Sequence, residues 1–178
     1  MPASLVAVTA LALAAGPDAT ARSACRSAHA QPPAATKRAV VDATLCLLNQ
    51  RRAQHGLGRL RLSRALSLAA RRHADDMARH DYFAHGSLGG ASFLDRIRRT
   101  GYLRGARTWL VGENLAWGSG RGAAPSSVVD AWMRSPGHRL NILTRSFRDI
   151  GIGVAFGAPV PTEDGPALTY VTDFATRG

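Results

Sequence analysis

The sequence predicts an α+β domain in which helices cover an antiparallel sheet. Apolar residues recur at helical spacing between residues 37 and 100. Three β-rich segments punctuated by glycine follow later in the chain: "TWLVGENLAWG", "DIGIGVAFG" and "ALTYVTDFA". One helix separates the first two of these segments, and there is no regular strand–helix–strand rhythm. This order of elements is typical of α+β proteins.

The first helix is expected from Lys37 to His55. The segment "HGLG" ends it, because Gly56 or Gly58 can adopt the left-handed conformation that a helix C-terminus favours. Ser63 is a candidate N-cap for a second helix. One face of that second helix carries Leu66, Ala69, Ala70, His73, Met77 and His80.

A short helix is expected over residues 93–102, capped by Ser92. Asp95 in its first turn and two arginines in its last turn suit the helix dipole, and Gly101 closes it.

In the second half of the chain, "SSVVDAWMRS" predicts a helix that Pro125 is placed to open. The pair Pro136–Gly137 is expected to break this helix and to present His138 at a turn. The segment "APVPTEDGPA" is expected to be the hairpin loop between the last two strands.

Residues 1–21 resemble a signal peptide, since "SLVAVTALALAAG" has the length of its apolar region and "ATA" suits a cleavage site. No basic residue precedes the apolar run, so a plain apolar N-terminal helix is the alternative. Residues 22–36 form an Ala/Pro-rich linker, and the domain spans residues 37–178. We expect a secreted or extracytoplasmic monomer with no transmembrane segment.

The chain contains two cysteines, Cys25 and Cys46, with none left over. In a secreted protein an even number predicts a disulfide, which here would tie the linker to the first helix. Two buried free thiols are the alternative for a cytosolic protein.

The formal charge is +11 and the isoelectric point is near 11.4. Such a balance attracts polyanions. However, the arginines are scattered along the chain and no nucleic-acid motif is present, which favours a basic solvated surface with no nucleic-acid partner.

Four polar residues do not fit the apolar pattern around them: His85, Glu113, His138 and Asn141. Glu113 lies within a β-rich apolar segment, and a buried carboxylate needs a partner such as histidine. Two histidines and one carboxylate also match an open zinc site. A purely structural network that joins loops to the strand is the alternative.

Other catalytic sites find no support in the sequence. There is no GxSxG nucleophile motif, and "GSGRG" lacks the Lys-Ser/Thr ending of a phosphate-binding loop. Cysteine catalysis is excluded if the two cysteines are bonded.

Four motifs occur in the order and rough spacing of the CAP superfamily, which comprises cysteine-rich secretory, antigen 5 and pathogenesis-related proteins. They are "YFAHGSLGGASFLDRI", "GENLAWG", "AWMRSPGHRLNIL" and "YVTDFA". The chain resembles the single-domain bacterial branch from about Val40 to Ala175. The resemblance implies an α-β-α sandwich with an open cleft, and it places His85, Glu113 and His138 at the cleft floor.

Some members of the family bind a divalent metal through the two histidines, so the resemblance implies a zinc-type site on His85 and His138. The second glutamate of larger eukaryotic members is absent, because Met133, Arg134 and Ser135 follow the helix tryptophan. The resemblance therefore does not imply a mechanism that needs two carboxylates.

These observations predict a ligand-binding module whose His/Glu-lined cleft takes a lipid, a cell-wall polymer or a protein. The alternative is a metal-dependent hydrolase that uses His85 and His138 as ligands and Glu113 as general base. A third possibility is a basic surface that docks on acidic wall polymers.

Overall fold

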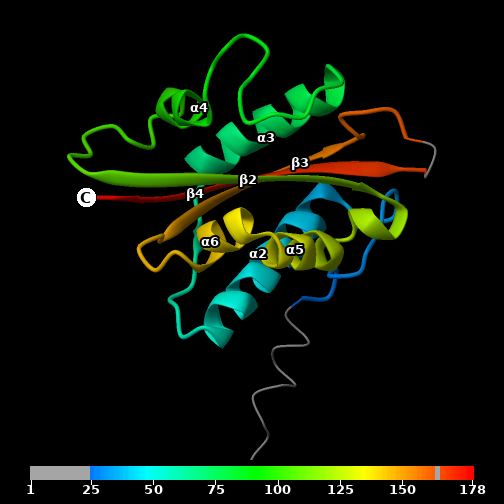
Figure 1. Cartoon of the computed structure of the whole chain (residues 1–178), viewed down its shortest axis with the longest axis horizontal. Helices are drawn as coiled ribbons and strands as arrows, with labels where there is room; N and C mark the ends of the chain where they lie inside the picture. Colours follow the sequence, from blue (N-terminus) through cyan, green and yellow to red (C-terminus); the bar gives the residue numbers. More distant parts are fainter. Residues whose placement is uncertain (1–24, 163–164) are drawn as a thin grey trace, which may run out of the picture.

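A four-stranded sheet lies between two layers of helices in the computed structural model, which describes residues 25–162 and 165–178 (Figure 1). The strands are β1 (Arg61–Leu62), β2 (Trp109–Ser119), β3 (Asp149–Phe156) and β4 (Ala167–Arg177). Their order is β1-β3-β4-β2, and β4 is antiparallel to both of its neighbours. This confirms the α+β sandwich. The short strand β1, which the sequence pattern did not predict, adds to β3 in parallel.

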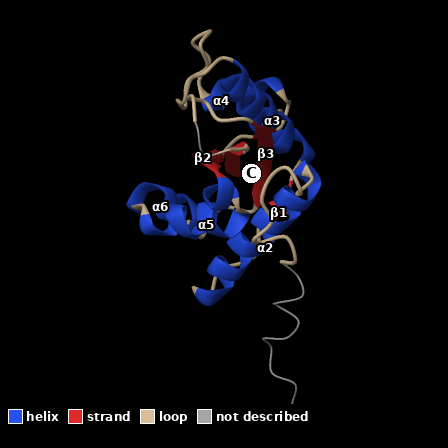
Figure 2. Cartoon of the chain, turned by 90° about the vertical axis from the view of Figure 1, so that its right-hand side faces the viewer, coloured by secondary structure: helices blue, strands red, loops and turns tan. Residues whose placement is uncertain are grey.

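The helices divide between the two faces of the sheet (Figures 1 and 2). One face is covered by α3 and α4, and the other by α2, α5 and α6. Their bounds are α2 (Lys37–Gln54), α3 (Arg64–Arg79), α4 (Phe93–Arg99), α5 (Pro125–Arg134) and α6 (Pro136–Leu143), with a 3₁₀ turn η1 (Gly120–Ala123) before α5. None of the helices in the described ranges is long and apolar enough to cross a membrane. The expected signal peptide, residues 1–21, lies outside these ranges.

The predicted caps begin α3 and α4. The Ser63 hydroxyl accepts a hydrogen bond from the backbone N–H of Leu66. Ser92 and Asp95 form a capping box at the start of α4, each side chain bonding the backbone N–H of the other. Gly56 follows α2 with a φ of +64°, as a left-handed C-terminal residue should.

The expectation that Pro136 and Gly137 form a turn was wrong, because they begin the helix α6. Ser135 has an extended conformation that separates α5 from α6. Proline suits the first position of a helix, where its missing N–H removes no intrahelical hydrogen bond. His138 therefore lies in the first turn of a helix.

Glycines let α3 lie directly on the sheet. A Cβ atom at Gly151 would overlap the backbone of Leu66, and one at Gly153 would overlap the backbone of Ala70 and Arg71. The opposite face of the sheet instead contributes large side chains to the main core, including Ile150, Ile152, Val154, Tyr170 and Phe174.

The predicted disulfide is confirmed: Cys25 and Cys46 are joined with an S–S distance of 2.06 Å. It attaches the segment before α2 to that helix. The same segment contacts the start of α5, where the backbone N–H of Ser126 donates to the carbonyl of Ala28 at 2.8 Å. Ala35 in this segment belongs to the main core.

We predict that Gly153→Ala lowers the free energy of unfolding by about 2 kcal/mol or more, since overpacking against backbone cannot be relieved by a rotamer change. Thermal unfolding measures the effect. Gly58→Ala is the matched control, because a Cβ atom at Gly58 would have no heavy atom within 4 Å and the φ of Gly58 is not positive. Equal melting temperatures for the two variants would contradict the close approach of α3 to β3.

Candidate functional site

The candidate site lies along β2, which is an edge strand of the sheet. Successive side chains of a strand point to opposite faces. Accordingly, Glu113 contacts Arg96 of α4 on one face, whereas Asn114 contacts α6 on the other. Two adjacent residues of one strand thus connect both helical layers to the same edge.

The carboxylate of Glu113 is buried and has two partners. Its Oε1 lies 2.8 Å from Nδ1 of His85, and its Oε2 accepts a hydrogen bond from Nη2 of Arg96 at 2.7 Å. Only 1% of the Glu113 side chain is exposed. A charge at this depth is tolerated because both carboxylate oxygens are engaged by donors.

His85 lies in the loop between α3 and α4, and 58% of its side chain is exposed. The hydrogen bond to Glu113 raises the pKa of His85 above its ordinary value of 6.5, against a smaller opposing effect of burial. Since Nδ1 faces the carboxylate, it carries the proton in the neutral ring. The Nε2 lone pair is then left for another partner.

His138 lies in the first turn of α6, and its backbone carbonyl accepts a hydrogen bond from Nδ2 of Asn114 at 3.1 Å. Burial lowers the pKa of His138 below 6.5, and the nearby charge of His85 lowers it further. The structure thus brings the two histidines close enough to influence each other. Protonation favours His85, and His138 remains neutral to a lower pH.

Asn141 fixes α6 against β2. Its Nδ2 donates to the backbone carbonyl of Glu113 at 3.2 Å and to Oδ1 of Asn114 at 2.8 Å. A Cβ atom at Gly112 would overlap the Asn141 amide, so the small residue in "GEN" permits this approach. The observed contacts of Asn141 position His138.

Sequence reasoning missed Arg96 and Asn114. Arg96 is buried, and its Nη1 also donates to Ser87 Oγ and to the carbonyl of Ala91. Nothing in the sequence separates Arg96 from the other arginines of its helix. Asn114 had a usable signal, because it is an amide next to Glu113 inside an apolar strand.

A third missed residue, Asp173, lies on the central strand β4 directly opposite Glu113. It is fully buried, and no donor among the described residues bonds its carboxyl oxygens. Burial raises the pKa of Asp173 well above 3.8, and the negative charge of Glu113 raises it further. The signal was present in "YVTDFA", where one acidic residue interrupts an apolar strand. Asp173 thus supplies a second carboxyl group where the sequence had indicated only one.

The residues of the site differ in their freedom to bind a metal. No group of three or more His, Cys, Asp or Glu residues within the described ranges is arranged to hold a metal ion. Both oxygens of Glu113 are already bonded. The available ligands are therefore the two imidazoles of His85 and His138, with water needed to complete a coordination shell.

The histidines of α3 and its C-terminus have other partners. His73 is buried, and its Nε2 bonds the carbonyl of Ala84 at 2.9 Å. Burial lowers the pKa of His73, with the charge of Arg96 as a second cause. His80 bonds Asp76 through Nδ1 at 2.9 Å. His73 therefore holds α3 against the following loop, whereas the bond of His80 lies within the end of α3.

A model of the cysteine-rich secretory protein family, CAP, matches residues 45–172. Two proteins of Bacillus subtilis (strain 168) are similar in sequence. The uncharacterized protein YkwD is 36% identical over 117 residues, which are 66% of this chain and 43% of YkwD. The uncharacterized membrane protein YlbC is 33% identical over 110 residues, 62% of this chain and 30% of YlbC. The chain thus spans less than half the length of these two relatives.

Solved structures with the same fold include an extracellular protein containing an SCP domain from Bacillus anthracis str. Ames. That structure has a TM-score of 0.59 and 25% identity, over 79% of this chain and 43% of the other. An outer surface protein from Borrelia burgdorferi has a TM-score of 0.62 at 22% identity, over 81% of this chain and 97% of the other.

We predict that Asp173→Asn stabilises the protein relative to the wild type, and increasingly so as the pH rises above about 4. Native Asp173 keeps its proton at pH values where the unfolded chain has released it. Unfolding then releases a proton, and the wild type loses up to about 1.4 kcal/mol of stability per pH unit in this window. The asparagine side chain has no such proton. Denaturant unfolding at several pH values between about 4 and 7 measures the difference.

Asp42→Asn serves as the control for the loss of one carboxylate, because Asp42 is largely exposed on α2. A difference between Asp173→Asn and the wild type that stays constant or shrinks with rising pH would show that Asp173 is ionised in the folded protein.

We predict that Glu113→Ala costs about 3 kcal/mol or more, because it leaves the buried Arg96 guanidinium without its carboxylate. Glu113→Gln keeps an acceptor for Arg96 and should cost less. In both variants the pKa of His85, followed by NMR titration, should fall, because the hydrogen bond to Glu113 is the main cause of its upward shift. An unchanged His85 titration would contradict this pairing in solution.

Proposed function

Because the chain belongs to the cysteine-rich secretory protein (CAP) family, we propose that it is an extracytoplasmic ligand-binding domain that acts through His85, Glu113 and His138. The disulfide between Cys25 and Cys46 supports an oxidising compartment. The extracellular and outer-surface proteins that share its fold agree with this location.

One observation carries the proposal: a buried carboxylate orients an exposed histidine. The Glu113 side chain is 1% exposed and the His85 side chain is 58% exposed, yet they are joined by a 2.8 Å hydrogen bond. A network that served only to join loop and strand would have no need to leave its imidazole in solvent. Orientation by a carboxylate prepares the imidazole to meet a ligand through Nε2.

The same orientation suits a divalent metal such as zinc. Zinc-binding histidines commonly bond a carboxylate through their second nitrogen, which is the relation of His85 to Glu113. His85 and His138 are the residues that would hold the ion. A bound ion would supply an electrophilic centre for oxygen donors of a ligand. Asn114 and Asn141 would keep α6, and with it His138, in place.

The hydrolase alternative has weaker support, because it needs Glu113 as a general base. Both carboxylate oxygens of Glu113 are already engaged, one by His85 and one by Arg96. A general base must reach the proton that it removes, directly or through one water molecule. Glu113 would have to give up one of these buried contacts to do so, which favours a binding role.

We predict that Zn²⁺, used as the probe, binds the full chain with modest affinity and that His85→Ala and His138→Ala each remove nearly all of this binding. One remaining imidazole is a poor site. Neutral imidazole is the ligand form, so binding should weaken as the pH falls. Because the pKa of His85 is raised, protons should begin to compete above pH 6.5. Isothermal titration calorimetry at several pH values measures both effects.

His80→Ala is the matched control, since it removes an exposed histidine at the end of α3 that bonds Asp76. Binding that survives in His85→Ala or His138→Ala would place the metal elsewhere. A wild type that binds no Zn²⁺ would remove the metal from the proposal and the hydrolase alternative with it.

A further inference from the structure

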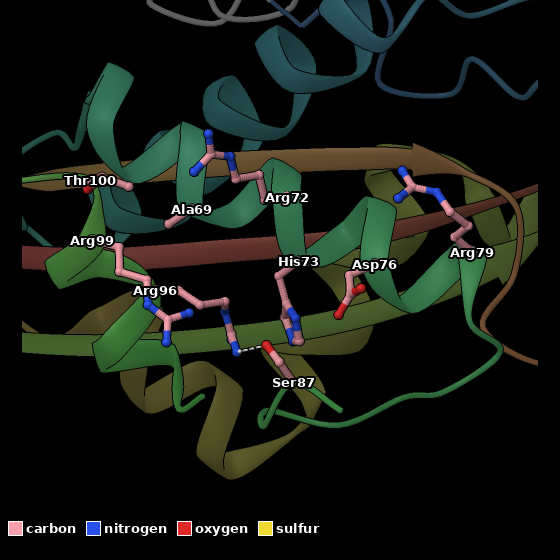
Figure 3. A pocket seen from close by; sticks show the side chains of 9 residues that line it. All are labelled: Ala69, Arg72, His73, Asp76, Arg79, Ser87, Arg96, Arg99 and Thr100. Atoms are coloured by element: carbon pink, nitrogen blue, oxygen red, sulfur yellow. Dashed lines mark hydrogen bonds between the residues drawn. The ribbon is translucent and has the colours of Figure 1, made fainter. Parts of the chain in front are cut away.

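A concave region lies between α3 and α4, beside the histidine site, with a cavity volume of about 240 Å³ (Figure 3). Two arginines from each helix line it: Arg72 and Arg79 come from α3, and Arg96 and Arg99 come from α4. The loop between these helices contributes Ser87. The lining includes none of His85, Glu113 and His138, and Arg96, the partner of Glu113, is the residue that the pocket shares with the histidine site.

The charges of the pocket are unbalanced. Its lining contains four guanidinium groups but only one carboxylate, that of Asp76. Asp76 accepts a hydrogen bond from the Tyr82 hydroxyl at 2.5 Å and lies 2.9 Å from Nδ1 of His80. The Asp76 carboxylate is therefore engaged by these two neighbours.

Three of the arginines lack an ion-pair partner among the described residues. Arg96 pairs with Glu113, whereas Arg72, Arg79 and Arg99 form no ion pair with any acidic residue in the described part of the chain. Like charges gathered in a concave surface repel each other and focus a positive potential there. An anion in the pocket would relieve this repulsion.

The donors of α4 gather at one end of the pocket. Figure 3 shows the side chains of Arg96 and Arg99 next to each other, with Arg96 bonded to Ser87. The Nη atoms of Arg96 are committed to Glu113, Ser87 and the Ala91 carbonyl. Its Nε is buried without an acceptor among the described residues.

We propose that this pocket binds the phosphate group of a small phosphate ester or of an anionic lipid headgroup. Guanidinium groups match the oxygens of phosphate with paired, charge-assisted hydrogen bonds. A phosphate offers more oxygens than one guanidinium can bond, which suits the end of the pocket where Arg96 and Arg99 lie next to each other. The cavity is smaller than a typical site for a drug-sized ligand, which suits a compact headgroup.

The pocket and the histidine site share Arg96. A phosphate in the pocket would attract the Arg96 guanidinium, which pairs with Glu113. Glu113 in turn orients His85. Binding of an anion in the pocket should therefore change the electrostatic surroundings of His85. The phosphate site itself does not depend on the proposed function of the histidines.

The test measures binding of two probes to the full chain at constant ionic strength. Glycerol 3-phosphate is titrated by calorimetry or NMR, and co-sedimentation is measured with phosphatidylcholine vesicles that contain or lack phosphatidic acid. The variants Arg72→Gln and Arg99→Gln each remove one unpaired pocket arginine. Both residues are exposed, and neither contacts Glu113, so folding should be preserved.

The matched controls are Arg71→Gln and Arg98→Gln. Each is the sequence neighbour of a tested residue on the same helix and lies outside the pocket lining. Arg98 instead lies over the ring of Trp109 at 5.6 Å. Control and test variants change the net charge equally, so a general attraction of the basic chain for anions affects both alike.

We expect saturable binding by the wild type, with a loss of about tenfold or more in each pocket variant and of no more than about twofold in each control. If the binding of glycerol 3-phosphate depends on the pocket arginines, the ligand is a soluble phosphate ester. If only the binding to phosphatidic acid vesicles depends on these arginines, the ligand is a lipid headgroup. Equal losses in test and control variants, or no saturable binding of either probe, would overturn the proposal.

Discussion

The burial of the Glu113 carboxylate is the constraint on which the rest of the site depends. A negative charge inside an apolar layer is tolerated only if cations or donors compensate it. Arg96 does so from within the fold, and His85 does so from the surface. Compensation thus has two results. It anchors α4 and the preceding loop to β2, and it holds an exposed imidazole in one orientation.

The alternation of side chains along β2 also connects this strand to the other helical layer. While Glu113 faces α4, Asn114 faces α6 and bonds both the His138 carbonyl and Asn141. The two histidines therefore come from opposite sides of one edge strand. Opposite shifts of their pKa values follow from their surroundings, because one gains a carboxylate partner and the other gains only burial and a neighbouring charge.

Asp173 and the arginine-lined pocket show how the remaining charges adjust to Glu113. Asp173 lies opposite the same carboxylate in the strand pairing, and its pKa is raised by burial and by the negative charge of Glu113. Arg96 is the only pocket arginine that pairs with an acidic residue in the described part of the chain, which leaves the others free to attract an anion. A single guanidinium thus connects the histidine edge with the basic pocket.

By itself, the sequence determined the features that arise from local interactions. These include the caps at Ser63 and Ser92, the three long strands and the anomalous position of Glu113; the disulfide was predicted from the even number of cysteines. Periodicity and capping act within a few residues, so they can be recognised without the fold. Tertiary structure decided the rest: that Pro136 begins a helix, that β1 joins β3, that Arg96 rather than Arg98 neutralises Glu113, and that Asp173 lies opposite it. The physical reason is that the partner of a buried charge depends on which distant elements pack together. The spacing of residues in the sequence does not reveal which elements these are.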